Sequence, residues 1–245
     1  MKANYFFLIL IMVFASCEKP SDCFESAGSL NTKTVEVSEF SSIVINHGIA
    51  AEITQDSIFS VLIEAPENLI SDIEVEIVDG ILKISDKSTC NFTRKYGLTT
   101  IKITAPNLTE IHSQTEKNIS SKGVLSYPSL ALFSTDFGDG VGTGDFVLEL
   151  NSNNLSINTN NVSGFYISGQ TENLVANFYE GNGILRAKDL VVENAEIFQR
   201  SSNHLHLKAS QSLTGKILST GNVFCYGIPN TVEVEQPYIG KLIYQ

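Results

Sequence analysis

Residues 146–226 read FVLEL at 146–150, FYIS at 165–168, ILRA at 184–187, LHLK at 205–208 and VFCY at 223–226. These short apolar runs begin 19, 19, 21 and 18 residues apart. A second series begins at Leu155, Leu174, Leu190 and Leu213, in steps of 19, 16 and 23 residues. Two strand positions therefore recur at a nearly fixed period. Such a period of short strands is typical of a β-solenoid, in which each coil covers the next.

The segments between these runs are rich in Asn, Ser, Gly and Asp, as at 138–140, 142–144, 158–161 and 181–183. These residues tolerate the left-handed backbone that sharp corners require. We therefore expect residues 106–245 to form a right-handed parallel β-helix or similar solenoid. An antiparallel meander or sandwich would use the same strands and is the alternative.

Residues 34–105 alternate apolar and polar residues with a period of two, so the whole protein is expected to be all-β. This β-rich N-terminal portion is a candidate cap for the solenoid. Its best hairpin signal is Asp79-Gly80 within 75–84, because both positions of a type I′ turn need positive φ. A weaker hairpin signal lies at 45–49, and residues 67–73 could form one short helical turn.

The first sixteen residues have the organisation of a secretory signal peptide. A short charged start is followed by an apolar run at 5–14 and by Ala15-Ser16-Cys17. The four residues Phe14-Ala15-Ser16-Cys17 resemble the bacterial lipobox, in which cleavage occurs before the cysteine. We expect residues 1–16 to be removed as a lipoprotein signal peptide, Cys17 to carry the lipid, and residues 17–33 to form a lipidated tether that anchors the chain to the membrane.

Three further cysteines remain after Cys17. An exported protein permits a disulfide between Cys23 and Cys90, but the sequence alone does not establish it. Cys225 lies in an apolar strand and is most simply a small buried hydrophobic residue.

The chain of 245 residues carries 16 basic and 27 acidic side chains, a net charge of −11. Nucleic acids and anionic membranes both require basic surfaces. The composition therefore excludes a nucleic-acid partner.

Several stretches resemble the family called putative auto-transporter adhesin, head GIN domain. They lie at 40–45, 64–70, 78–84, 103–111 and 221–229, and the likeness covers roughly 34–243. The resemblance implies a fold like right-handed β-helices. It also implies an exported protein or lipoprotein of the kind found in Bacteroidetes-type bacteria.

Clustered carboxylates stand in the glycine-rich stretch 135–145, at Asp136, Asp139 and Asp145. Flexible carboxylates are the ligands that Ca²⁺ prefers, and a suitably spaced pair can cleave a glycosidic bond. Asp and Gly are also ordinary corner residues. No other metal or cofactor is expected.

Aromatic residues recur at similar phases of the repeats. Alternation places one residue of each adjacent pair outside, which makes Tyr166, Tyr179 and Tyr226 the candidate exposed set that could stack on sugar rings. The same alternation directs His204 and His206 outward.

These observations favour a non-catalytic adhesion or ligand-binding module on the cell envelope, lipid-anchored at the outer membrane, with a glycan or a surface protein as its partner. One alternative is a polysaccharide-active enzyme that uses Asp136, Asp139 and Asp145. Another is a structural envelope protein without a ligand. Fold alone does not decide among them.

Overall fold

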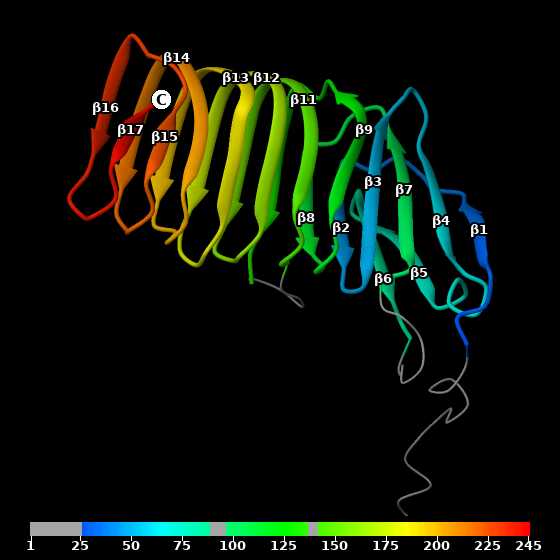
Figure 1. Cartoon of the computed structure of the whole chain (residues 1–245). Helices are drawn as coiled ribbons and strands as arrows, with labels where there is room; N and C mark the ends of the chain where they lie inside the picture. Colours follow the sequence, from blue (N-terminus) through cyan, green and yellow to red (C-terminus); the bar gives the residue numbers. More distant parts are fainter. Residues whose placement is uncertain (1–25, 89–96, 137–141) are drawn as a thin grey trace, which may run out of the picture.

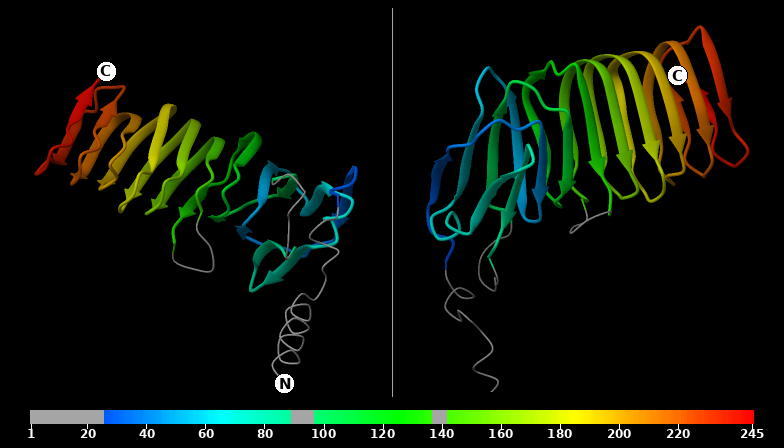
Figure 2. Two further views of the ribbon diagram at one scale, coloured as in Figure 1. Left: turned by 60° about the horizontal axis from the view of Figure 1, so that its bottom comes forward. Right: turned by 180° about the vertical axis from the view of Figure 1, so that it is seen from behind.

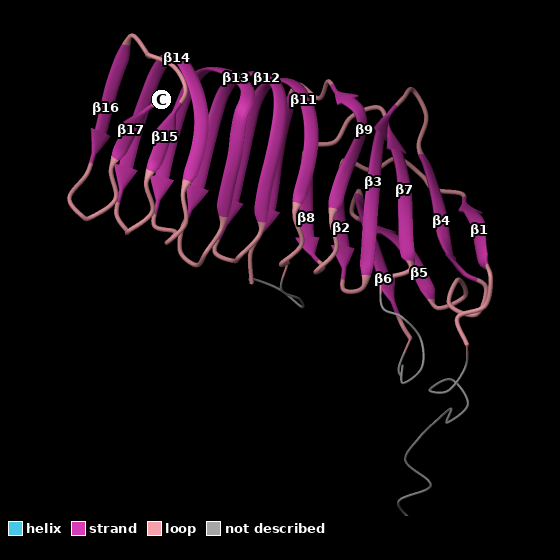
Figure 3. Ribbon diagram, in the orientation of Figure 1, coloured by secondary structure: helices cyan, strands magenta, loops and turns pink. Residues whose placement is uncertain are grey.

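The computed structural model describes residues 26–88, 97–136 and 142–245 (Figure 1). Within these ranges every regular element is a strand, and no helix is present (Figure 3). The all-β expectation is confirmed. None of the described residues belongs to a helix that could cross a membrane.

Seventeen strands make up the described part of the chain. They are β1 (Leu30–Val35), β2 (Ser42–Asn46), β3 (Ile49–Gln55), β4 (Ser60–Pro66), β5 (Ile73–Val78), β6 (Ile81–Asp86), β7 (Thr99–Ala105), β8 (Glu110–Gln114), β9 (Ile119–Leu125), β10 (Ser129–Ser134), β11 (Phe146–Thr159), β12 (Gly164–Phe178), β13 (Ile184–Gln199), β14 (Leu205–Ile217), β15 (Val223–Cys225), β16 (Thr231–Glu235) and β17 (Leu242–Tyr244).

The strands form two faces of one solenoid. The first face, sheet I, runs in the order β1, β4, β7, β3, β9, the first halves of β11 to β14, β15 and β17. The second face, sheet II, runs in the order β5, β6, β2, β8, β10, the second halves of β11 to β14, and β16. Each of β11 to β14 bends once and so belongs to both sheets, as the stacked coils in Figures 1 and 2 show.

The solenoid interpretation is confirmed by the register of these coils. Phe146 pairs with Phe165, Phe165 with Leu185, Leu185 with Leu205, and Leu205 with Val223, all between parallel strands. All five side chains are fully buried. A single coil could not cover such an apolar face, so stacking the coils supplies the core. The antiparallel sandwich is excluded for β11 to β14.

The second repeat series was assigned wrongly at one position. The structure aligns Leu155, Leu174, Ala195 and Leu213, so Ala195 and not Leu190 belongs to it. Leu190 lies in the sheet I half of β13, where it pairs with Gly169. Residues inserted into β13 by a bulge shifted the apolar pattern, which explains the uneven steps in the sequence.

The N-terminal strands stack out of sequence order. In sheet II, β2 lies between β6 and β8, and in sheet I, β3 lies between β7 and β9, all in parallel. The coil formed by β2 and β3 is therefore inserted between two later coils. Beyond β6 and β7, the strands β5, β4 and β1 are antiparallel to their neighbours. They end the solenoid on this side.

The hairpin prediction at Asp79-Gly80 is confirmed, because φ is 53° at Asp79 and 75° at Gly80 in the turn between the antiparallel strands β5 and β6. The weaker hairpin at 45–49 is wrong. Since β2 pairs with β6 and β8 while β3 pairs with β7 and β9, this turn is a corner between the two sheets. Residues 67–72 form turns, including one bond from the Ile70 amide to the Pro66 carbonyl at 3.0 Å.

Candidate functional site

A row of side chains crosses the outer face of sheet I. Neighbouring strands pair Val147 with Tyr166, Tyr166 with Arg186, Arg186 with His206, and His206 with Phe224. Their neighbours along each strand point into the core, as alternation requires. We call these five residues the outer row. It brings together an exposed aliphatic residue, aromatic rings, a guanidinium and an imidazole from five successive strands.

A groove of about 690 Å³ lies along the outer row. Its walls include Tyr166, Arg186 and His206 of the row and Tyr226, which follows β15. Tyr166 is 43% exposed and Val147 is 44% exposed, so the groove offers apolar surface to solvent. Glu149, Ser121 and Ser168 add polar groups. The groove is the candidate functional site.

A bulge in β13 forms another part of the wall. Ala187 pairs with Leu207 and Val191 with Lys208, so three residues of β13 have no counterpart on β14. Leu190 points inward and is buried, whereas Lys188 and Asp189 are both exposed and line the groove. Bulges re-aim side chains in this way at the sites of many sheets. Here the bulge directs two adjacent charged residues into the groove.

His206 is held by its aromatic neighbours. Its ring stacks on Phe224 at 4.7 Å between centroids and 15° between planes, and its Nδ1 lies 3.1 Å from the Tyr226 hydroxyl. Partial burial lowers the pKa of His206, and the positive charges of Arg186, His204 and Lys188 lower it further. At neutral pH the imidazole is therefore predominantly neutral.

The structure brings together two of the three tyrosines predicted to be exposed. Tyr166 and Tyr226 line the groove. Tyr179 is 40% exposed but lies just beyond the end of β12, where its hydroxyl is 3.4 Å from the Asn158 Oδ1 atom and its ring is 5.8 Å from Phe198. It does not share a surface with the other two.

Two of the three predicted aspartates make corner hydrogen bonds. The Asp136 amide donates to the Asn160 Oδ1 atom at 3.1 Å, and its carboxylate accepts from the Asn160 side-chain amide. The Asp145 Oδ1 atom accepts from the Gly164 amide at 2.8 Å. Asp139 lies outside the described residues. Among the residues that are described, no group of three or more His, Cys, Asp and Glu is placed to hold a metal ion.

The remaining predicted residues are placed as follows. Cys225 is fully buried, which confirms its assignment to the core, and burial raises the pKa of its thiol. Cys17, Cys23 and Cys90 lie outside the described residues, so lipidation and the disulfide stay predictions. His204 is exposed and accepts from the Asn222 amide at 3.0 Å, consistent with its outward orientation.

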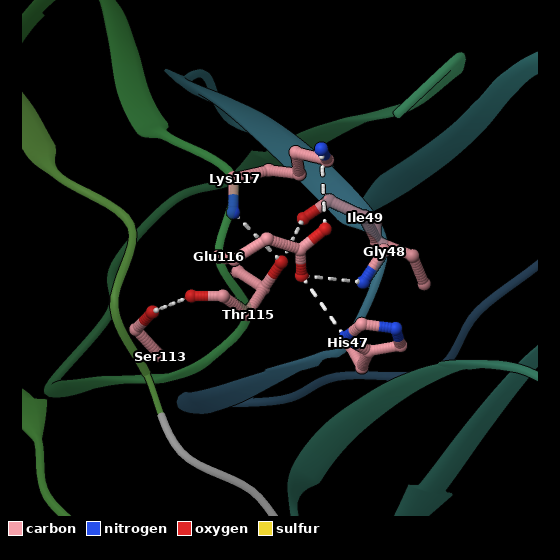
Figure 4. Close-up of polar contacts among 7 residues, drawn as sticks. All are labelled: His47, Gly48, Ile49, Ser113, Thr115, Glu116 and Lys117. Carbon is pink, nitrogen blue, oxygen red and sulfur yellow. Dashed lines mark hydrogen bonds and ion pairs between the residues drawn. The ribbon is translucent and has the colours of Figure 1, made fainter. Parts of the chain in front are cut away.

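A second polar cluster joins two corners of the solenoid (Figure 4). The Glu116 carboxylate accepts from the Gly48 amide at 3.1 Å and pairs with His47 at 3.0 Å and with Lys117 at 3.1 Å. The Thr115 hydroxyl donates to the Ile49 carbonyl at 2.9 Å. These contacts tie the turn between β2 and β3 to the turn between β8 and β9. The cluster therefore fixes the inserted coil.

The Glu116 carboxylate should make folding depend on pH. Partial burial raises its pKa, but hydrogen bonds from its own amide, from Gly48 and from Lys117, together with the charge of His47, bring the pKa below its ordinary value. A lowered pKa stabilises the fold above the unfolded-state value and loses that effect as pH falls through the folded-state value. The contribution is modest because the His47 side chain is 84% exposed.

Glu116→Gln is therefore expected to lower the melting temperature at pH 7 by about 2 °C, with the difference from the unmodified protein disappearing as the pH falls through the lowered folded-state pKa of the carboxyl. Thermal melts followed by circular dichroism between pH 3 and pH 8 measure this. Glu110→Gln is the matched control, because Glu110 pairs at 2.9 Å with His112 of its own strand and so joins no two corners. An equal loss for both variants would contradict the coil-joining role.

Sequence reasoning did not identify Arg186, Lys188 or Asp189 as site residues. Arg186 could have been found, because it occupies the same outward repeat position as Tyr166 and His206. Lys188 and Asp189 depend on the bulge, which the sequence showed only as an irregular step.

Comparisons with known proteins agree with the fold. A family model described as "Putative auto-transporter adhesin, head GIN domain" matches residues 39–229. A comparison with curated proteins finds no match.

Solved structures share the architecture. A putative adhesin from Bacteroides fragilis is 20% identical with a TM-score of 0.81, over 90% of this chain and 100% of that one. A putative adhesin from Parabacteroides distasonis is 15% identical with a TM-score of 0.64, over 90% and 99%. A protein of the same species called a putative lipid binding protein is 18% identical with a TM-score of 0.62, over 88% and 97%. At these identities the likeness shows the fold alone.

Proposed function

The chain belongs to the family described as putative auto-transporter adhesin, head GIN domain, and from this premise we propose that it is a non-catalytic adhesion module whose groove on sheet I binds a glycan. The observation that carries the proposal is the groove of about 690 Å³, in which the exposed ring of Tyr166 lies beside charged and hydroxyl groups. Sugars need this combination, because their rings stack on aromatic faces while their hydroxyls need hydrogen-bond partners.

The solenoid supports this role because it presents the groove on a stiff platform. Side-chain bonds run from coil to coil at the bend between the sheets: Asn173 donates to Asn154 at 3.1 Å, Asn194 donates to Asn173 at 3.3 Å, and Ser212 donates to Asn194 at 2.8 Å. Such ladders hold the strands of neighbouring coils in register. A pre-organised site loses less conformational entropy when it binds.

The aspartates at the corners support a non-catalytic role. Glycoside hydrolysis needs two carboxyl groups on either side of the bond that is cleaved, one as an acid and one as a base or nucleophile. Asp136 and Asp145 instead bond Asn160 and Gly164 of the following corner. They serve the fold in the way that the turn interpretation predicts.

We place the module on the outside of the cell envelope. Lipid on Cys17 and a tether over 17–33 would hold the start of β1 near the membrane, and β1 lies at one end of the solenoid. The groove is formed by β9 and β11 to β14 together with Tyr226, farther along the stack (Figure 1). A rigid body anchored at one end would hold this face away from the lipid surface.

Tyr166→Ala tests the proposal on a glycan array. Loss of the aromatic platform is expected to weaken retention of the bound glycan about tenfold or more, since a tyrosine at the centre of an interface often contributes about 2 kcal/mol. Tyr179→Ala is the matched control, because Tyr179 is exposed to a similar extent and lies outside the groove. Equal binding by the unmodified chain and Tyr166→Ala, or an equal loss with Tyr179→Ala, would contradict the proposal.

A further inference from the structure

Two cations of the groove have no protein partner in the part of the chain that the structure describes. Among the described residues, neither the Arg186 guanidinium nor the Lys188 ammonium makes a hydrogen bond or an ion pair. Both side chains are exposed and both line the groove. Their donors are therefore available to a ligand, and a guanidinium can bind a carboxylate through two parallel hydrogen bonds.

The register places these donors next to the aromatic platform. Arg186 pairs with Tyr166 on one side and with His206 on the other. Neighbouring strands lie about 4.8 Å apart. A pyranose ring is of comparable width, so a sugar that stacks on Tyr166 would bring a substituent on its ring within reach of Arg186.

The cations also determine where in the groove a negative group would bind. The whole chain carries a net charge of −11. The pKa of His206 is nevertheless lowered, mainly by burial and further by the positive charges of Arg186, His204 and Lys188. Since His206 is then predominantly neutral, the positive charge in this part of the groove comes from Arg186 and Lys188. Because Glu149 and Asp189 also line the groove, a negative group on a ligand would be attracted locally, by the Arg186 guanidinium, and not by a net positive groove.

The groove also contains two carboxylates, Glu149 and Asp189. They would repel a densely charged polyanion but can accept hydrogen bonds from sugar hydroxyls. An acyl chain would need a continuous apolar lining without charges, whereas four charged side chains share this wall with its apolar groups, namely Glu149, Arg186, Lys188 and Asp189. Taken together, the groups fit a ligand with a ring face, several hydroxyls and an isolated carboxylate.

We propose that the groove binds an acidic saccharide, with the ring of one sugar on Tyr166 and its carboxylate bound by the Arg186 guanidinium. This inference rests on the proposed function and specifies its ligand class. Lys188 supplies a second positive charge from the bulge of β13. Glu149 and Asp189 accept from hydroxyl groups.

The test uses the full chain on an array of acidic oligosaccharides, namely oligogalacturonates, hyaluronan fragments and sialyllactose. Each is printed beside its carboxyl-reduced or desialylated neutral counterpart, and the pair with the strongest signal is then titrated by calorimetry. The unmodified chain is expected to bind the acidic member with a Kd at least tenfold lower than that of the neutral member.

Arg186→Gln is expected to reduce this preference to less than about threefold while leaving the melting temperature unchanged, because the side chain is exposed. Arg200→Gln is the matched control. It removes the same charge from another exposed arginine of the chain, one outside the groove lining, and should preserve the preference.

The possible failures are distinguishable. If acidic and neutral members bind equally and Tyr166→Ala weakens both, the groove binds glycans without selecting the carboxylate, and only this inference is overturned. If no oligosaccharide is retained, the proposed function fails with it. Capture of the chain by phosphatidylglycerol vesicles but by no oligosaccharide would overturn both in favour of a lipid headgroup.

Discussion

Gly215→Ala is expected to lower the free energy of unfolding by about 4 kcal/mol, with a fall in melting temperature of roughly 8–16 °C. Gly215 lies in the sheet II half of β14, paired with Ile197 of the preceding coil and Val234 of the next. Its φ of 122° falls in a region that residues with a side chain rarely adopt. Adding a side chain there strains the backbone by about 1–3 kcal/mol.

The second part of the cost is steric. A Cβ atom at Gly215 would lie 1.9 Å from the carbonyl oxygen of Ile197, which is backbone of the neighbouring coil. Backbone in the middle of a parallel ladder cannot move aside without loss of its own hydrogen bonds. The coils must therefore separate locally or the strand must rotate.

Gly80→Ala is the control that isolates the backbone term. Gly80 also has a positive φ, 75°, but a Cβ atom there would meet nothing within 4 Å. Strain alone should cost about 1–2 kcal/mol. Denaturant unfolding of both variants measures the difference, and equal losses would show that the close approach to Ile197 contributes nothing.

Much of the solenoid could be predicted from its apolar runs, because inward positions of successive coils must match to form a core. The runs beginning at Phe146, Phe165 and Leu205 correspond to strand starts or lie within one residue of them. Leu190 was misassigned because the bulge inserts Lys188 and Asp189 before it and so shifts the apolar positions along β13. The residues of such a bulge do not differ in amino-acid composition from those of a regular strand or corner, so the sequence does not reveal it.

The insertion of β2 and β3 between later coils could not be predicted. Residues Ile45 to Ile49 have the composition of a tight turn, and a hairpin and a solenoid corner both use such residues. The choice depends on partners that are distant in the sequence, such as Glu116, which contacts Gly48 from 68 residues away. Asp79-Gly80 was predictable because a two-residue type I′ turn is determined locally.

The candidate site was predictable to the extent that it follows alternation. Tyr166 and Tyr226 were found because each directly follows a buried residue, Phe165 in β12 and Cys225 at the end of β15. Their meeting in one groove, and the exclusion of Tyr179, depend on which sheet each residue occupies. Lys188 enters the groove through the bulge. Charge was the strongest sequence signal for the aspartates, but hydrogen bonding to the next corner accounts for Asp136 and Asp145.

Phe165→Ala is expected to lower the free energy of unfolding by about 3–5 kcal/mol. Phe165 is fully buried in β12. Its ring stacks on Phe146 of the preceding coil at 5.0 Å between centroids and 7° between planes, and meets Phe178 edge-on at 5.8 Å. Truncation removes the apolar surface that the ring buries and both ring contacts. It also leaves a cavity between the two sheets, which cannot close because the backbone hydrogen bonds between strands hold each sheet in place.

Tyr166→Ala provides the comparison within the same strand, because the two aromatic residues are adjacent and point to opposite faces of sheet I. Tyr166 is already 43% exposed, so its truncation should cost about 1 kcal/mol or less while it weakens glycan binding. Guanidinium unfolding and array binding of the two variants separate the roles. Comparable stability losses would mean that the outer row is packed as tightly as the core. The groove would then not be a preformed binding site. We expect Phe165→Ala to lose much more stability than Tyr166→Ala, and only Tyr166→Ala to lose glycan binding. This result would show that one face of β12 holds the coils together and the other face binds the ligand.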